Sequence, residues 1–104
     1  MQEKALQIIK DELEKNGLNA VKIILFGSRI RGDFRLDSDW DFLVVVDKFM
    51  PFSEKKSVTA QIKRKLGELE IPNDIILKPL SSFLEDKDIV GNISFFAQRE
   101  GIEL

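Results

Sequence analysis

The chain has 104 residues, of which 43% are hydrophobic and 33% charged, a balance typical of one globular domain with a single modest core. Its formal net charge of −2 provides no basic surface for a nucleic-acid backbone, so we expect no direct binding of DNA or RNA. Cysteine and histidine are both absent, which excludes disulfides, thiolate or imidazole metal ligands, and cysteine or serine–histidine catalysis. Any acid–base or metal chemistry must therefore use carboxylates, with Lys and Arg as electrostatic helpers.

Nothing in the sequence predicts a targeting or membrane segment. The N-terminal MQEKALQIIKDELEK is charged throughout, unlike a signal peptide, and no apolar run approaches the roughly 20 residues that cross a bilayer. No internal repeat, low-complexity tract or linker divides the chain. We therefore expect a cytoplasmic protein with no membrane contact, in which residues 1–104 form a single domain.

Hydrophobic periodicity predicts the first elements in chain order. Residues 2–16 carry apolar side chains at helical spacing, and Gly17 stands where a left-handed C-terminal cap is expected. Residues 22–26 (KIILF) predict a short buried strand, and residues 28–38 predict a short helix followed by a loop. The strongest strand signal is DWDFLVVV, residues 39–46, which is apolar on both faces after its start, as in a central strand.

The second half of the chain alternates helix and strand again. A break in the chain at residues 50–52 precedes the remaining elements, predicted as a helix at 53–69, a strand at 74–78, a further helix and a last strand at 102–104. Ser82 and Glu85 form a capping-box pattern that opens the further helix, which Gly91 or Asn92 interrupts and Gly101 ends. This order predicts an α/β or α+β domain with a small mixed sheet flanked by helices.

Gly27-Ser28 lies at a predicted junction between strand and helix. A helix N-terminus presents free N–H groups and partial positive charge, so it favours a phosphate that Gly27 would let approach and the Ser28 hydroxyl would bond. Taken alone, the pair is also typical of a tight turn with a serine N-cap. A Walker loop is excluded because Asp33 stands where that motif needs Lys, and the dinucleotide fingerprint lacks its second glycine.

Asp39 and Asp41 open the strongest predicted strand. Side chains two residues apart in a strand point to the same face, so both carboxylates are expected on one side. Two like charges held close raise each other's pKa, and a hard divalent cation such as magnesium or manganese relieves the repulsion. The alternative is that two polar residues simply mark the exposed start of a strand.

Asp74 opens the next predicted strand, after a Pro-Asn turn. On a neighbouring strand it would face the same pocket, bind a metal ion, and take the proton from an attacking hydroxyl. Taken alone, an Asp at this place is more typical of a residue that caps a turn.

Three arginines surround the predicted loop: Arg29, Arg31 and Arg35. A guanidinium matches a phosphate in bidentate fashion, and Arg31, beside Gly32, is the preferred contact for a triphosphate. Surface arginines also serve in ordinary solvation or in ion pairs, here with Asp33 and Asp37.

Read together, GSRIRGDFRLDSDWDFLVV resembles the signature of the polymerase-beta-like nucleotidyltransferase superfamily: Gly-Ser, ten intervening residues, then Asp-x-Asp. The Arg31-Gly32 pair, Ser38 and the ending AQREGIEL are similar to its small bacterial and archaeal branch, the minimal nucleotidyltransferases of the MntA type that are often paired with HEPN-domain proteins. Trp40 stands where smaller aliphatic residues are more familiar, and its ring is expected to pack on the face opposite the carboxylates.

The resemblance implies a fold, a site and a reaction. Gly27 and Ser28 would hold the phosphates of a nucleoside triphosphate, expected to be ATP. Asp39, Asp41 and Asp74 would bind two magnesium ions, with manganese as a substitute, and Asp74 would act on the acceptor hydroxyl. The enzyme would transfer NMP to that hydroxyl and release pyrophosphate. The expected acceptor is a tyrosine of a HEPN-type toxin, which would make the chain the antitoxin of the pair.

Two other functions stay open at this point. Larger relatives carry further domains that grip the acceptor, so a partner protein or a second copy of the chain, as a homodimer, is expected to complete this site. A non-catalytic subunit that binds a nucleotide or neutralises its partner is the first alternative, and transfer to a small molecule such as an aminoglycoside is the second. Phe49, Met50 and Phe52 would form either a partner surface or the packing of a loop.

Overall fold

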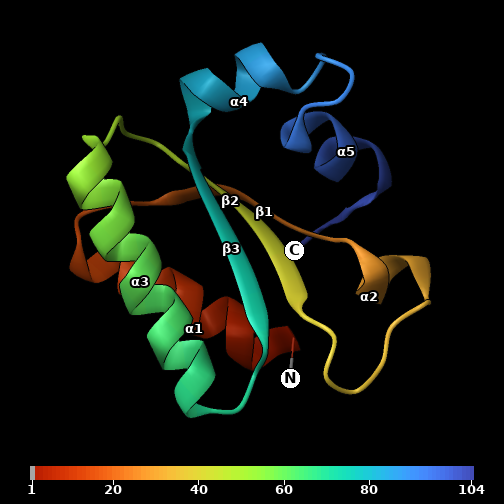
Figure 1. Ribbon diagram of the computed structural model, residues 1–104. Coiled ribbons are helices and arrows are strands. Elements are labelled where there is room, and N and C mark those ends of the chain that lie inside the picture. The colour runs from red at the N-terminus through yellow and green to blue at the C-terminus, as the bar shows by residue number, and fades with distance from the viewer. Residues whose placement is uncertain (1) are drawn as a thin grey trace.

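A four-stranded sheet with strand order β3-β2-β1-β4 organises the computed structural model, which describes residues 2–104 (Figure 1). The strands are β1 (Ala20–Phe26), β2 (Trp40–Val46), β3 (Asn73–Pro79) and β4 (Ile102–Glu103). β1 pairs antiparallel with both β2 and β4, whereas β2 and β3 are parallel. The sheet is therefore mixed, as predicted, and β3 is one of its two edges.

Helices lie on both faces of the sheet (Figure 1). They are α1 (Gln2–Lys15), α2 (Ser28–Arg31), α3 (Phe52–Glu68), α4 (Leu80–Asp86) and α5 (Ile93–Glu100). α1 and α3 pack on one face of β2, while α4 and α5 pack on the other. The short α2 follows β1 directly, as the sequence predicted.

The central strand β2 divides the core in two because its neighbouring side chains point to opposite faces. Phe42, Val44 and Val46 pack with apolar residues of α1 and α3. Leu43 and Val45 pack with residues of α4 and α5. All five side chains are fully buried, which confirms that this strand is covered on both sides.

Most predicted elements are confirmed to within one or two residues. Gly17, which follows α1, also has the predicted left-handed conformation (φ 71°), and its N–H donates to the Glu14 carbonyl. The capping box at Ser82 is wrong, because α4 begins at Leu80 after an N-cap Pro79 and has no side-chain cap. An interruption is confirmed, but it begins earlier than predicted: α4 already ends at Asp86, and α5 is a separate helix that starts after Asn92.

The three apolar residues before and at the start of α3 have different environments. Phe49 and Phe52 are exposed, whereas Met50 is buried in the core and belongs to no surface. Within residues 2–104 no helix is long and apolar enough to cross a bilayer.

Candidate active site

One cavity of about 480 Å³ brings together residues that are far apart in the sequence. It opens where β1 ends and where β2 and β3 begin, because Phe26 is paired with Asp41 and Asp41 with Asp74. Its lining residues are Phe26, Gly27, Arg31, Asp41, Asp74, Ile76, Ile93, Phe96 and Glu100. Four of the six residues predicted for the site, Gly27, Arg31, Asp41 and Asp74, therefore surround one space.

Asp41 and Asp74 face the same side of the sheet. They are direct partners in the parallel β2–β3 ladder, and laterally paired residues project to one face. Ile76, two residues beyond Asp74, packs toward α4 and α5 and thus defines that face. Trp40 packs with the α1 and α3 side, so its predicted position on the opposite face is confirmed.

Gly27 is shaped by its contact with Asp41. Its φ of 82° lies in the region that favours glycine, and a Cβ placed there would overlap the Asp41 Oδ2 atom. A glycine is therefore required at this junction for two separate reasons. Gly27 is also the N-cap of α2, and no side chain caps the helix, so the alternative of a serine N-cap is wrong.

Ser28 is the first residue of α2, and its side chain does not line the cavity. It lies directly after Gly27, at the positive end of a helix of four residues. Asp39 immediately precedes β2 and also lies outside the cavity lining, but its charge acts on Asp41.

The carboxyl group of Asp41 is held in an unfavourable environment. Partial burial raises its pKa above the usual 3.8, and the negative charges of Asp74 and Asp39 raise it further, while Arg31 opposes them. Carboxylate oxygens are hard donors of the kind that magnesium and manganese prefer, and a bound cation would relieve the repulsion between the carboxylates. The donor type therefore fits a divalent cation at Asp41 and its neighbours.

The three carboxylates are not gathered into a ready-made cage. Across residues 2–104, no three acidic side chains lie close enough together to hold a metal ion. The Asp74 carboxylate is 56% exposed, and its Oδ1 atom lies 3.8 Å from the Nζ atom of Lys63. Binding of one ion by all three carboxylates would therefore require side-chain rotation at this site.

Arg31 reaches across the cavity to a residue that the sequence interpretation missed. Its Nη1 atom lies 3.4 Å from the Glu100 Oε1 atom on α5, and its Nε lies 3.7 Å from the Asp33 Oδ2 atom. Glu100 and Asp74 both line this cavity. The signal for Glu100 was present in the motif AQREGIEL, but no local pattern indicated that this acid lies opposite Arg31.

Arg29 has a structural role instead. Its Nη2 atom donates to the carbonyl oxygens of Leu36 and Ser38, at 3.1 and 2.9 Å, and so closes the loop between α2 and β2. Its guanidinium also stacks on the rings of Phe34 and Trp40, at 4.7 and 4.6 Å. This loop carries Asp39, so Arg29 positions the start of the acidic pair.

The chain is similar to several known proteins. The family model "Polymerase beta, Nucleotidyltransferase" matches residues 7–92. A spectinomycin 9-adenylyltransferase of Staphylococcus aureus is 34% identical over 76 residues, which cover 73% of this chain and 28% of that enzyme. The chain thus spans little more than a quarter of that relative. A Methanocaldococcus jannaschii protein named "Putative protein adenylyltransferase" is 29% identical over 91 residues, 81% of each chain.

A solved structure shares the fold. A chain of the mutant toxin–antitoxin complex MntA–HpeT superposes with a TM-score of 0.59 at 16% identity, covering 99% of this chain and 71% of that chain. At that identity the likeness concerns the fold alone. The match of the family model over residues 7–92, most of the 104, identifies the family. The chain belongs to the polymerase beta nucleotidyltransferase family.

Proposed function

We propose that this chain is an enzyme that transfers an adenylyl group from ATP to a hydroxyl group of another protein. The observation that carries this proposal is the lateral pairing of Asp41 with Asp74 on one face, in a cavity bounded by Gly27 and Arg31. Such a cavity offers backbone and a guanidinium to phosphates on one side and a carboxylate to an acceptor on the other.

The nucleotide would lie with its phosphates at the junction of β1 and α2. Gly27 brings bare backbone to the cavity, Ser28 adds its hydroxyl at the helix start, and Arg31 would exchange Glu100 for a phosphate. Glu100 would then be released from its cation, so phosphate binding is coupled to α5.

Asp39 and Asp41 would hold divalent magnesium or manganese, expected as two ions together with Asp74. Bound there, the metal would supply neutralisation of the charge that grows on the α-phosphate. The mutual repulsion felt at Asp41 favours such binding.

Asp74 would act on the acceptor. The acceptor oxygen forms a bond to the α-phosphorus, and the bond from that phosphorus to the oxygen bridging the β-phosphate breaks. Pyrophosphate leaves with that electron pair, and the hydroxyl proton passes to the Asp74 carboxylate and then to water. The exposure of Asp74 makes it accessible to a large acceptor.

The acceptor in this proposal is a tyrosine of a HEPN-domain toxin, and the chain acts as the antitoxin. Support comes from the sequence motif, from the Methanocaldococcus jannaschii relative named "Putative protein adenylyltransferase", which matches over 81% of each chain, and from the fold shared with a chain of MntA–HpeT. The spectinomycin enzyme favours a second candidate, transfer to an aminocyclitol hydroxyl, but this chain spans only 28% of its length.

Transfer from α-labelled ATP tests the proposal. The chain is incubated with ATP, magnesium and either a HEPN-domain protein from the same genome or spectinomycin. Wild type is expected to label the protein, whereas Asp41→Asn is expected to reduce the rate by about 100-fold or more and EDTA to stop it. Asp37→Asn, the same chemical change outside the cavity, should retain activity. Labelling of spectinomycin and not of the protein would show that the acceptor is a small molecule. Equal activity of Asp41→Asn and wild type would refute the mechanism.

A further inference from the structure

A second cavity, of about 470 Å³, runs along the free edge of β3. One wall is the outer side of α3 from Phe52 to Lys63, and the other consists of Ile75, Ile76 and Leu77. Because neighbours in a strand point to opposite faces, a cavity lined by three consecutive residues must follow the edge of the strand. We call this cavity the β3 groove.

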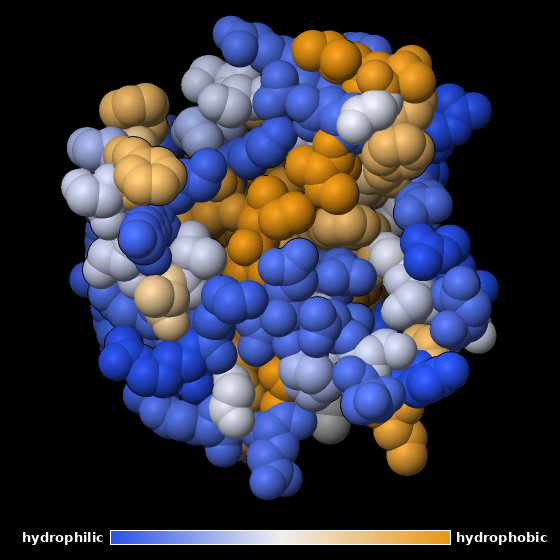
Figure 2. All heavy atoms as spheres, in the orientation of Figure 1, coloured by the Kyte–Doolittle hydropathy of each residue, from blue (hydrophilic) through white to orange (hydrophobic). Residues whose placement is uncertain are grey.

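The edge of β3 in the groove has no strand beside it. β3 is terminal in the sheet, and within residues 2–104 it pairs only with β2. An open edge presents unpaired backbone groups, and extended polypeptides commonly add to such edges. Figure 2 shows apolar side chains exposed in the middle of this view, continuing toward α4 and α5, with mostly polar residues over α3.

The rim of the groove is basic. Lys55, Lys56 and Lys63 of α3 all line it, and neither Lys55 nor Lys56 lies within 4 Å of a carboxylate among the described residues. The chain as a whole is acidic, with a net charge of −2, so this concentration of lysines is local. Phe52 is 79% exposed at the far end of the groove and offers an apolar contact. The complementary ligand is an extended segment with acidic and apolar side chains.

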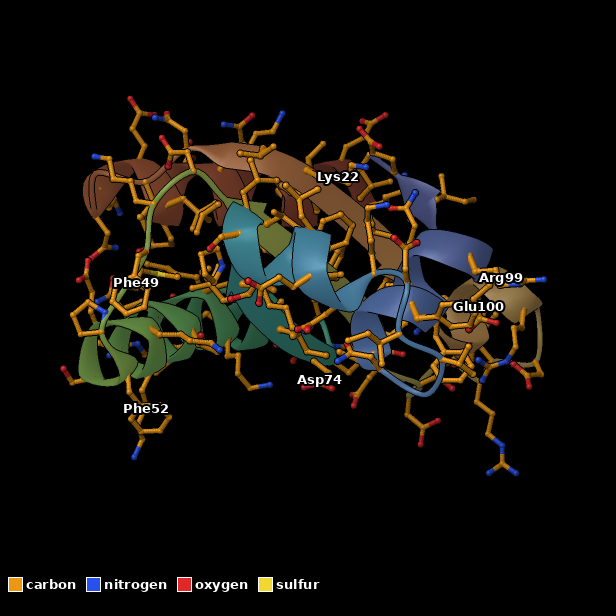
Figure 3. The ribbon with its side chains drawn as sticks, turned by 90° about the horizontal axis from the view of Figure 1, so that it is seen from above. Lys22, Phe49, Phe52, Asp74, Arg99 and Glu100 are labelled. Atoms are coloured by element: carbon orange, nitrogen blue, oxygen red, sulfur yellow. The ribbon has the colours of Figure 1, made fainter. Side chains whose placement is uncertain are left out.

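The groove leads to the active site. Ile76 lines both cavities, and Lys63 of the groove lies 3.8 Å from Asp74 of the active site. In Figure 3, Asp74 lies between Phe52, toward the left of the view, and Glu100, toward the right. A strand laid along β3 would therefore end beside the carboxylate that is proposed to receive the acceptor proton.

We infer that the β3 groove binds the acceptor polypeptide, as an added strand whose acidic and apolar residues alternate and whose hydroxyl residue lies at Asp74. The role assigned to the groove, binding of the acceptor, rests on the proposed transfer to a protein. Its physical basis, the binding of an acidic extended segment, is independent of nucleotide and metal and is measured without them.

The test uses two synthetic peptides and the isotope-labelled chain. One peptide alternates Glu and Val around a single Tyr, and its counterpart has Lys in place of Glu. In fluorescence anisotropy, the acidic peptide is expected to bind at least about 10-fold more tightly than the basic peptide. The lysines of the basic peptide would face the lysines of the groove, and these like charges repel. The acidic peptide should shift the amide resonances of Ile75, Ile76 and Leu77 and those facing them on α3. Equal binding of both peptides, or shifts confined to other surfaces, would overturn the inference.

A charge reversal sharpens the test. Lys55→Glu with Lys56→Glu should invert the preference between the two peptides and leave magnesium-dependent ATP binding unchanged. Lys4→Glu with Lys10→Glu, an equal charge change on exposed residues of α1, should keep the wild-type preference. If wild type binds the acidic peptide but does not bind ATP, the proposed function is rejected and the β3 groove inference stands. Shifts of the groove amides by a single-stranded oligonucleotide and not by the peptides would reject the groove as a polypeptide site.

Discussion

At the scale of single residues, the contact between Gly27 and Asp41 links the two halves of the nucleotidyltransferase motif. The sequence places them fourteen positions apart, and the antiparallel pairing of β1 with β2 brings them together. A side chain on Gly27 would have to displace the Asp41 carboxylate. The glycine therefore has a steric function toward the acid as well as its expected function toward a phosphate.

Gly27→Ala is expected to lose both stability and nucleotide binding. The positive φ and the overlap with Asp41 should lower the free energy of unfolding by about 1–3 kcal/mol and weaken ATP binding about 10-fold or more. Gly17→Ala is the control, because Gly17 also has a positive φ of 71° but open space around it. Urea unfolding and calorimetry would measure both effects. ATP binding reduced equally in the two variants would show that the contact with Asp41 has no part in the loss.

Asp41→Asn is expected to make the metal-free protein more stable at neutral pH. The folded pKa of Asp41 lies above its ordinary 3.8, so the folded protein binds more protons and the free energy of unfolding falls as pH rises through that window. Asn does not ionise, so the variant avoids this fall in the free energy of unfolding. Its stability advantage over wild type should disappear well below pH 3.8, where Asp41 is protonated in both the folded and the unfolded protein. Thermal unfolding with EDTA at both pH values measures it, with Asp37→Asn as the control. A lower Tm for Asp41→Asn at neutral pH would contradict the electrostatic account.

At the scale of elements, Lys78 fixes the pair α4–α5 to the sheet. Its Nζ atom donates to Ser94 Oγ at 2.7 Å, to Asp86 Oδ2 at 2.9 Å and to Asn92 Oδ1 at 3.3 Å. All three acceptors lie in α4, α5 or the segment between them. Because α5 supplies one wall of the active-site cavity, this ammonium group also positions that wall.

Lys78→Met should cost about 2–4 kcal/mol of folding free energy, since it leaves the Asp86 carboxylate half-buried without a cation. Hydrogen exchange should accelerate first in α5. Lys87→Met removes an exposed ion pair with Asp88 and should cost less than about 1 kcal/mol. Urea unfolding of the two variants gives the comparison. Equal costs would mean that the Lys78 network does not hold the helices.

Local patterns predicted the elements well where one signal dominated. The long amphipathic α1 and α3 and the doubly buried β2 follow from periodicity alone. The capping-box pattern failed because Pro79, with φ −70°, already ends β3 and lets a helix start at Leu80. Ser82 and Glu85 instead lie within the helix, and the sequence alone does not distinguish that placement from a capping box.

At the scale of the whole molecule, the site depends on pairings that no local pattern contains. Gly27, Asp41 and Asp74 could be predicted because motif spacing and strand starts mark them. The register that places Asp41 beside Asp74, and the approach of Glu100 to Arg31, arise only from the strand order and the return of α5 over the sheet. The β3 groove likewise follows from β3 being an edge, which the sequence does not show.

The most direct test of the central claim is calorimetric binding of ATP to wild type and to Asp41→Asn, each with and without magnesium. If Asp41 and its neighbouring carboxylates form a metal-dependent nucleotide site, wild type binds ATP with magnesium and binds it much more weakly without. Asp41→Asn should lose the magnesium-dependent part and keep its fold. Equal ATP binding by both proteins, with or without magnesium, would contradict the assignment of this cavity as the active site.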